Sequence, residues 1–98
     1  MIQKKEALFK ESHAPKRPKE LECSVMTFVN AGEKWIGFIG LLNGRPYEIF
    51  TGKHENFPIP SYVDRGQIIR TKGKDGKSNY DFLYIDKTNR EIEIPNLN

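Results

Sequence analysis

Between Leu21 and Ile94, apolar side chains recur with a period near two in about six short segments. This period places alternate side chains on opposite faces of a β-strand, whereas a helix would need a period of about 3.6 residues. Three connections contain a dipeptide that suits a tight hairpin turn: Ala31-Gly32, Asn43-Gly44 and Asp75-Gly76. The predicted strands are residues 21–30, 34–42, 45–52, 67–72, 79–86 and 91–94. The sequence therefore predicts an all-β domain of about six antiparallel strands.

The predicted strands form two meanders of three strands each. The segment between the meanders, His54–Gly66, contains Pro58 and Pro60 and so cannot be a regular central strand. We expect this segment to cross from one meander to the other, with a helical turn at Ser61–Asp64. Two twisted meanders that close on one another would give a small sandwich or a partly open barrel, which protects the edges of the sheet.

The turn dipeptides also predict which side chains share a face. In the first meander, Val25 is predicted to lie opposite Phe38 and Ile49 on the core side. That side also carries Leu21, Cys23, Ile36, Leu42 and Tyr47, and the other side carries Met26, Phe28, Trp35, Ile39 and Phe50. In the second meander, one predicted face holds Ile68, Leu83, Ile85, Ile92 and Ile94, and the other holds Ile69, Tyr80, Phe82 and Tyr84. This register places Arg70 opposite Asp81 as a cross-strand ion pair.

The first twenty residues differ from the rest in composition. They contain Pro15 and Pro18, which stop a helix, and they are rich in lysine. We interpret residues 1–20 as a flexible basic arm or linker and residues 21–98 as a single β domain. The N-terminus has no apolar run behind its basic residues, and no segment approaches the ~18 apolar residues of a membrane span. We therefore expect a cytoplasmic protein.

Patterns typical of catalytic or metal sites are sparse. Cys23 is the single cysteine, which excludes an intrachain disulfide and a cysteine-rich metal site, and we predict that its thiol is buried and inert. The Gly-Lys-Ser sequence at Gly76–Ser78 precedes a predicted strand, where a phosphate-binding loop would need a helix. Glu48 lies among aromatic residues but has no second acid and no base beside it. We predict that the chain itself is not catalytic and binds no metal or cofactor.

Two surface features suggest a binding role. The first is the face that carries Phe28, Trp35, Ile39 and Phe50, which could serve as a stacking platform for bases or as a docking patch for a protein. Because acidic residues interrupt the aromatic faces, protein contact is the preferred interpretation. The second feature is a candidate basic patch, formed by Lys16, Arg17, Lys19, Arg70, Lys72, Lys74 and Lys77. This patch leaves nucleic-acid binding as an alternative, although solvated tails and turns also accumulate lysines.

One stretch of the sequence is specific enough to suggest a family. The string EKWIGFIGLLNGRPYEIFTG at 33–52, with HAPKRPKELE before it and YDFLYIDKTNREIEI after it, resembles the C-terminal accessory region of the large adenosylcobalamin-dependent ribonucleotide reductases. The resemblance covers about residues 14–97. In those reductases this region follows the barrel that performs the chemistry, and the radical-bearing cysteine and the disulfide-forming pair have no counterpart here.

The resemblance implies a non-catalytic accessory or protein-docking module in the context of deoxyribonucleotide synthesis. It places adenosylcobalamin on the absent catalytic barrel, with no cofactor on this chain. The expected partner is a reductase large subunit or a second copy of the chain, with a homodimer as the favoured assembly and no membrane involved. The alternative is a nucleic-acid-binding small β-barrel with a basic arm.

Overall fold

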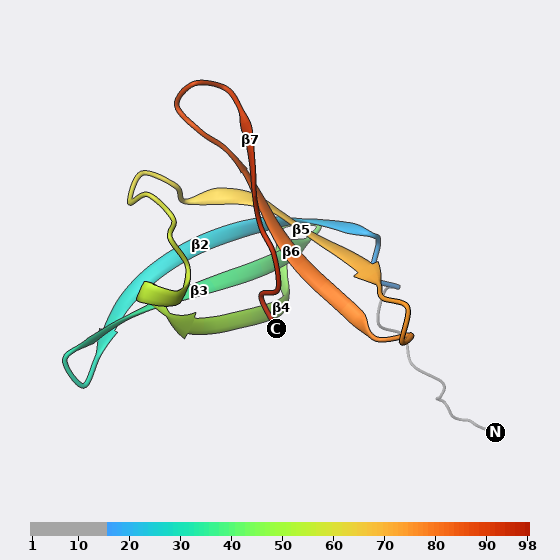
Figure 1. Cartoon of the computed structure of the whole chain (residues 1–98), viewed down its shortest axis with the longest axis horizontal. Helices are drawn as coiled ribbons and strands as arrows, with labels where there is room; N and C mark the ends of the chain where they lie inside the picture. The colour runs from blue at the N-terminus through green and yellow to red at the C-terminus, as the bar shows by residue number, and fades with distance from the viewer. Residues whose placement is uncertain (1–15) are drawn as a thin grey trace.

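The computed structural model describes residues 16–98, which fold into six antiparallel β-strands and one short 3-10 helix (Figure 1). The strands are β2 (Glu20–Asn30), β3 (Glu33–Leu42), β4 (Arg45–Lys53), β5 (Arg65–Lys72), β6 (Ser78–Ile85) and β7 (Glu91–Ile94). The 3-10 helix η1 is His54–Asn56. The predicted all-β fold of about six antiparallel strands is confirmed. Most of the predicted basic arm, residues 1–15, lies outside the described residues.

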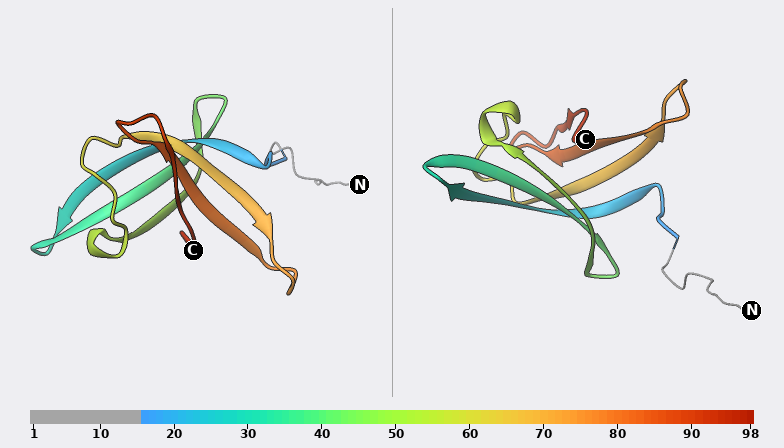
Figure 2. Two further views of the ribbon diagram at one scale, coloured as in Figure 1. Left: turned by 45° about the horizontal axis from the view of Figure 1, so that its top comes forward. Right: turned by 90° about the horizontal axis from the view of Figure 1, so that it is seen from below.

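The strands form one sheet in the order β4-β3-β2-β5-β6-β7. The two predicted meanders are present, and β2 pairs with β5 to join them into a continuous sheet. The sheet is strongly twisted and curled, so that β4 and β6 approach each other across its inner side, but it does not close (Figure 2). It is therefore a partly open barrel and not a sandwich of two separate sheets.

Two hairpin turns follow directly from their dipeptides. Ala31 and Gly32 have φ angles of 54° and 78°, and Asn43 and Gly44 have the same pair of values. Two successive residues with positive φ define the type I′ turn, whose twist matches that of the strands on either side. These turns fix β2 against β3 in the predicted register, with Val25 opposite Phe38.

The predicted faces of β4 are wrong because β4 contains a bulge. Gly40 pairs with Glu48, and Leu41 pairs with Pro46, so Tyr47 is the extra residue of the bulge. One extra residue shifts the register by one position and exchanges the two faces of the strand beyond it. As a result Phe38 lies opposite Phe50 and not opposite Ile49, which is 60% exposed.

The predicted faces of β6 are wrong for a related reason. The β5–β6 connection comprises five residues, 73–77, where the prediction assumed a two-residue turn at Asp75-Gly76. Arg70 therefore pairs with Tyr80, and Asp81 pairs with Ile69 and accepts a hydrogen bond from the Asn96 N–H at 3.0 Å. The predicted Arg70–Asp81 pair does not form. The inner face instead carries Tyr80, Phe82 and Tyr84, while Leu83 and Ile85 point outward.

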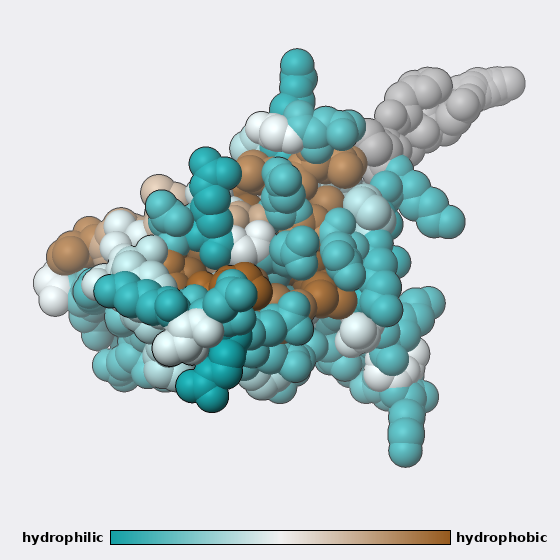
Figure 3. Space-filling view, turned by 90° about the horizontal axis from the view of Figure 1, so that it is seen from above, coloured by the Kyte–Doolittle hydropathy of each residue, from teal (hydrophilic) through white to brown (hydrophobic). Residues whose placement is uncertain are grey.

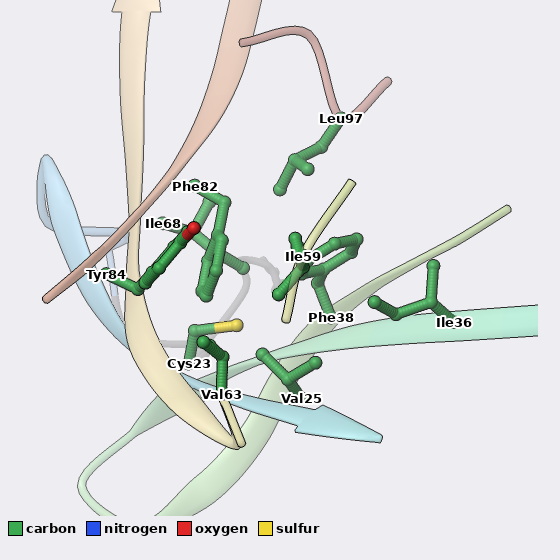
Figure 4. Close-up of a cluster of buried hydrophobic side chains, with 10 residues drawn as sticks. All are labelled: Cys23, Val25, Ile36, Phe38, Ile59, Val63, Ile68, Phe82, Tyr84 and Leu97. Carbon is green, nitrogen blue, oxygen red and sulfur yellow. The ribbon is translucent and has the colours of Figure 1, made fainter. Parts of the chain in front are cut away.

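The core lies inside the curl of the sheet. Its buried members are Leu21, Cys23, Val25, Ile36, Phe38, Ile59, Val63, Ile68, Phe82, Tyr84 and Leu97, most of which Figure 4 shows. Ile59 and Val63 come from the crossing segment, where Val63 N–H donates to the Pro60 carbonyl in a turn rather than in a helix. Leu97 follows β7 and is held by a 2.8 Å hydrogen bond to the Tyr80 carbonyl. These three side chains fill the open side that the strands leave.

Candidate functional site: the outer face and the basic end

The outer face of the first meander exposes a group of large apolar side chains. Because Cys23 and Val25 point inward, the alternation of β2 turns Met26 and Phe28 outward, where they are 47% and 39% exposed. Phe28 pairs with Trp35, and Ile39 pairs with Ile49, which brings neighbouring strands onto the same surface. We define the outer patch by these five residues: Met26, Phe28, Trp35, Ile39 and Ile49.

Gly37 lies in the middle of the outer patch. A Cβ atom there would lie 3.4 Å from Met26 Cγ, in ordinary van der Waals contact, so the position has room for a methyl group beside Met26. Next to it, Trp35 is half-buried, and its Nε1 atom is buried without a hydrogen-bond acceptor among residues 16–98. Tryptophan usually pairs its N–H group when that group is buried. The surface of the patch is thus apolar, and the unpaired donor is shielded from solvent.

The structure brings together three of the four predicted interaction residues and separates the fourth. Phe28, Trp35 and Ile39 share the outer patch. Phe50 lies on the inner side, where its ring centroid is 5.0 Å from that of Tyr80. Tyr80, Phe82 and Tyr84 also face inward, and Phe82 is fully buried, so they do not form a stacking platform. Met26 belonged to the predicted face, whereas Ile49 was missed because the bulge at Tyr47 could not be anticipated.

Arg17 is the most strongly anchored of the predicted basic residues. Its Nε and Nη2 groups donate to the two carboxylate oxygens of Glu48 at 2.9 and 2.8 Å, and its side chain is only 4% exposed. Its remaining donors reach the carbonyls of Pro18, Lys19 and Ile68 at 2.6, 3.0 and 3.4 Å. The guanidinium also lies 5.4 Å from the centroid of the Tyr80 ring. Arg17 therefore links the segment before β2 to β4, β5 and β6, and it is not available to a phosphate.

The local structure makes this ion pair possible. Glu48 reaches inward across Gly40, where a Cβ atom would lie 2.8 Å from Glu48 Cγ, so only glycine leaves room for the carboxylate. The hydrogen bond to Glu48 is the main reason that the pKa of Arg17 is raised above its ordinary value. Arg17 remains charged at every pH at which the protein is folded. The pair seals the inner side of the sheet near the start of β2.

The other basic residues gather at the same end of the molecule. The Arg70 N–H donates to the Lys19 carbonyl at 2.9 Å, which extends the pairing of β2 with β5 and places the two predicted clusters side by side. Figure 1 shows the start of β2 beside the end of β5 and the β5–β6 loop. We define the basic end by six residues: Lys16, Lys19, Arg70, Lys72, Lys74 and Lys77. Arg70 is half-buried, and the five lysines are exposed.

The sequence was also compared with known proteins. A family model described as the NrdJ homologue C-terminal domain matches residues 21–98. The chain belongs to this family. NrdJ is the B12-dependent ribonucleotide reductase, so the resemblance seen in the sequence is confirmed. Comparisons with curated proteins and with solved structures found no match.

The single cysteine of this NrdJ homologue C-terminal domain is a core residue. Cys23 is 3% exposed within the core, and burial raises the pKa of its thiol to about 12. A thiol in this state is a poor nucleophile and a poor metal ligand. Residues 16–98 contain no group of three or more His, Cys, Asp and Glu side chains that could hold a metal ion.

The surface also has a hollow beside the outer patch, where Ser24 is the cross-strand partner of Ile39. It has a volume of about 650 Å³, and its walls include Ser24, Leu41, Tyr62, Gln67 and Leu83. Figure 3 shows apolar side chains in a central band between hydrophilic ones on the side seen from above. Among the described residues, no helix is long and apolar enough to cross a membrane.

Proposed function

We propose that this NrdJ homologue C-terminal domain is a non-catalytic docking module that acts in the context of deoxyribonucleotide synthesis. The observation that carries the proposal is the outer patch, which nothing in residues 16–98 covers. Its members Met26, Phe28 and Ile49 are 47%, 39% and 60% exposed. Contiguous apolar surface of this kind on a small domain marks a site that another protein covers.

The charges around the outer patch support docking through apolar contacts. At its border, Lys53 Nζ lies 3.2 Å from Glu33 Oε2, so these charges compensate each other within the chain. A partner therefore needs an apolar surface and no complementary charge. A second copy of the chain meets this requirement, because two identical apolar patches are self-complementary across a two-fold axis.

Trp35 is the expected anchor of the interface. Tryptophan is enriched among the residues that contribute most to binding, and such residues lie near the centre of the buried patch. Its indole ring is half-buried, so a partner would cover the part of the ring that remains exposed. Phe28 lies opposite Trp35 and extends the same apolar contact.

The test introduces a charge into the outer patch without disturbing the core. Ile49→Glu replaces a side chain that is 60% exposed, so we expect the domain to remain folded. Sedimentation velocity over a range of concentrations should show a dimer for the wild-type chain and a monomer for Ile49→Glu. The matched control is Val29→Glu, because Val29 is 72% exposed but points to the other side of the sheet. This control should sediment like the wild-type chain.

A second assay addresses a reductase partner. If the wild-type chain is monomeric at every concentration, self-association is refuted, and the docking function then depends on binding to a B12-dependent reductase large chain. Isothermal titration with such a chain should show binding that Ile49→Glu weakens and Val29→Glu does not. Absence of binding in both assays would refute the docking function.

A further inference from the structure

The fold brings together two positively charged segments that lie about fifty residues apart in the sequence. Lys16 and Lys19 precede β2, while Arg70, Lys72, Lys74 and Lys77 lie at the end of β5 and in the loop that follows. The hydrogen bond between the Arg70 N–H and the Lys19 carbonyl joins the two segments directly. The basic end is thus a single surface created by the fold.

Arg17 holds one half of this surface in place. Its guanidinium donates to the carbonyls of Pro18 and Lys19 as well as to Glu48, so the backbone between Lys16 and Lys19 is fixed against the sheet. The neighbouring lysine side chains are left exposed. Arg17 is a positioning residue here, because its own charge is already compensated by Glu48.

The positive charges of the basic end are not neutralised within the described part of the chain. Within residues 16–98, none of the six basic side chains forms a salt bridge with a carboxylate. The nearby carboxylates of Glu48 and Asp75 already bind Arg17 and the Lys77 backbone N–H. Asp75, Asp81 and the exposed Glu20 also lie beside this surface, but its six basic residues outnumber these three acids. The basic end is therefore suited to a polyanion.

The composition of the surface favours a nucleic acid over an acidic protein. None of the large exposed apolar residues of the described chain lies in 16–19 or 70–77. Protein interfaces generally need an apolar or aromatic anchor, whereas contacts with a phosphate backbone need only lysine and arginine. Because no aromatic side chain is exposed in these two segments for stacking on bases, the contacts would carry no sequence information.

We propose that the basic end binds the phosphate backbone of nucleic acid without sequence preference. This inference is independent of the docking function, because the outer patch and the basic end consist of different residues. Each phosphate contact with a single strand contributes about −0.7 to the slope of log K against log salt concentration. Four to six contacts therefore predict a slope of about −3 to −4.

The test measures fluorescence anisotropy of a labelled, mixed-sequence single-stranded DNA oligonucleotide with the full chain at several salt concentrations. The variant carries Lys72→Ser, Lys74→Ser and Lys77→Ser, all at exposed positions in or beside the loop. The control carries Lys34→Ser, Lys53→Ser and Lys87→Ser, which changes the net charge equally but at other places. We expect the loop variant to bind on the order of tenfold more weakly at low salt, with a slope nearer zero by about 2, and the control to bind like the wild-type chain.

Three outcomes would overturn the proposal. Wild-type binding that is absent or independent of salt excludes phosphate contacts. An equal loss of affinity in the loop variant and the control would mean that only net charge matters and that the basic end is no site. Tighter binding of a labelled poly-glutamate peptide than of the oligonucleotide would identify an acidic protein as the partner. The loop variant retains the outer patch and the Glu33–Lys53 pair at its border, so its sedimentation reports on the docking function separately.

Discussion

Replacing Arg17 with methionine should destabilise the domain more than any other change before β2. Methionine keeps much of the side-chain length and fills the same space, but it leaves the Glu48 carboxylate, which is only 16% exposed, without its cation. Removal of one partner from a buried ion pair typically lowers the free energy of unfolding by 3–5 kcal/mol, which is about the range to expect here. Because Glu48 keeps some contact with water, the lower end of that range applies, so we expect a loss of about 3 kcal/mol.

This loss is large for a chain of 98 residues. A domain of this size has a total stability of about 5–15 kcal/mol, so the substitution removes a substantial fraction of it. At the thermal midpoint, about 1 kcal/mol corresponds to 4–8 °C in a small domain, which predicts a decrease of roughly 12–24 °C. The contacts of Arg17 with three carbonyls and with Tyr80 are lost at the same time, and they are not counted separately because these free energies are not additive.

A double-mutant cycle separates the ion pair from its surroundings. Arg17→Met and Glu48→Met are measured alone and together by urea unfolding, with the fluorescence of Trp35 as the signal, since it is the single tryptophan. The double variant should recover most of the stability, because replacing both partners by apolar side chains leaves no buried charge. We expect a coupling free energy of about 2–3 kcal/mol.

Two results together would show that the Arg17–Glu48 pair contributes little to stability. If Arg17→Met loses less than about 1 kcal/mol and the coupling with Glu48 is below about 0.5 kcal/mol, the pair behaves like an exposed salt bridge. Lys34→Met serves as the control for loss of a positive charge elsewhere, and it should change stability by less than about 0.5 kcal/mol.

Three further predictions test the core and the strand register. Burial raises the pKa of Cys23 to about 12, so the thiol ionises at lower pH in the unfolded state than in the folded state. The free energy of unfolding should therefore fall as the pH rises from about 8.5 towards 12, by up to ~1.4 kcal/mol per pH unit. In matched urea titrations Cys23→Ala should lack this slope, and the native thiol should not react with a thiol reagent at pH 8. Gly66→Ala should lower the free energy of unfolding by more than about 3 kcal/mol, because a Cβ atom there would lie 2.5 Å from the Phe82 ring. As the control, Gly37→Ala should change the free energy of unfolding by under ~1 kcal/mol. Leu97→Ala should lower the free energy of unfolding by about 2–4 kcal/mol, because this side chain is 5% exposed within the core. A change below ~1 kcal/mol would show that Leu97 does not pack there.

The strands could be predicted from the sequence because their signals are local. Period-two patterns and glycine-containing turns located all six strands with bounds within two residues of those observed. Register is a different problem, because it depends on the number of residues in each connection. The extra residue Tyr47 in β4 and the five-residue loop 73–77 each moved the pairing by one position. A single such shift exchanges the faces of a whole strand, which is why Phe50 and Phe82 lie inside while Ile49 and Ile85 lie outside.

In the candidate site, too, contacts set by local sequence could be predicted, and contacts set by the tertiary fold could not. Phe28, Trp35 and Ile39 were predicted together because the type I′ turn at Ala31-Gly32 fixes β2 against β3. The role of Arg17 was missed, because nothing in its immediate sequence distinguishes it from Lys16 and Lys19. Glu48 offered an indirect signal, since an acid surrounded by aromatic residues needs a cation from some other segment if its face is buried. The identity of that cation depends on the tertiary fold.

The Arg17–Glu48 pair also defines what belongs to the folded unit. The family match begins at residue 21, yet Glu48 within the matched region completes its hydrogen bonds with a residue before it. Because an isolated buried carboxylate is strongly unfavourable, Lys16–Lys19 is structurally part of the domain. The same four residues carry Lys16 and Lys19 to the basic end. One buried contact therefore seals the inner side of the open sheet and fixes the position of half of the proposed phosphate-binding surface.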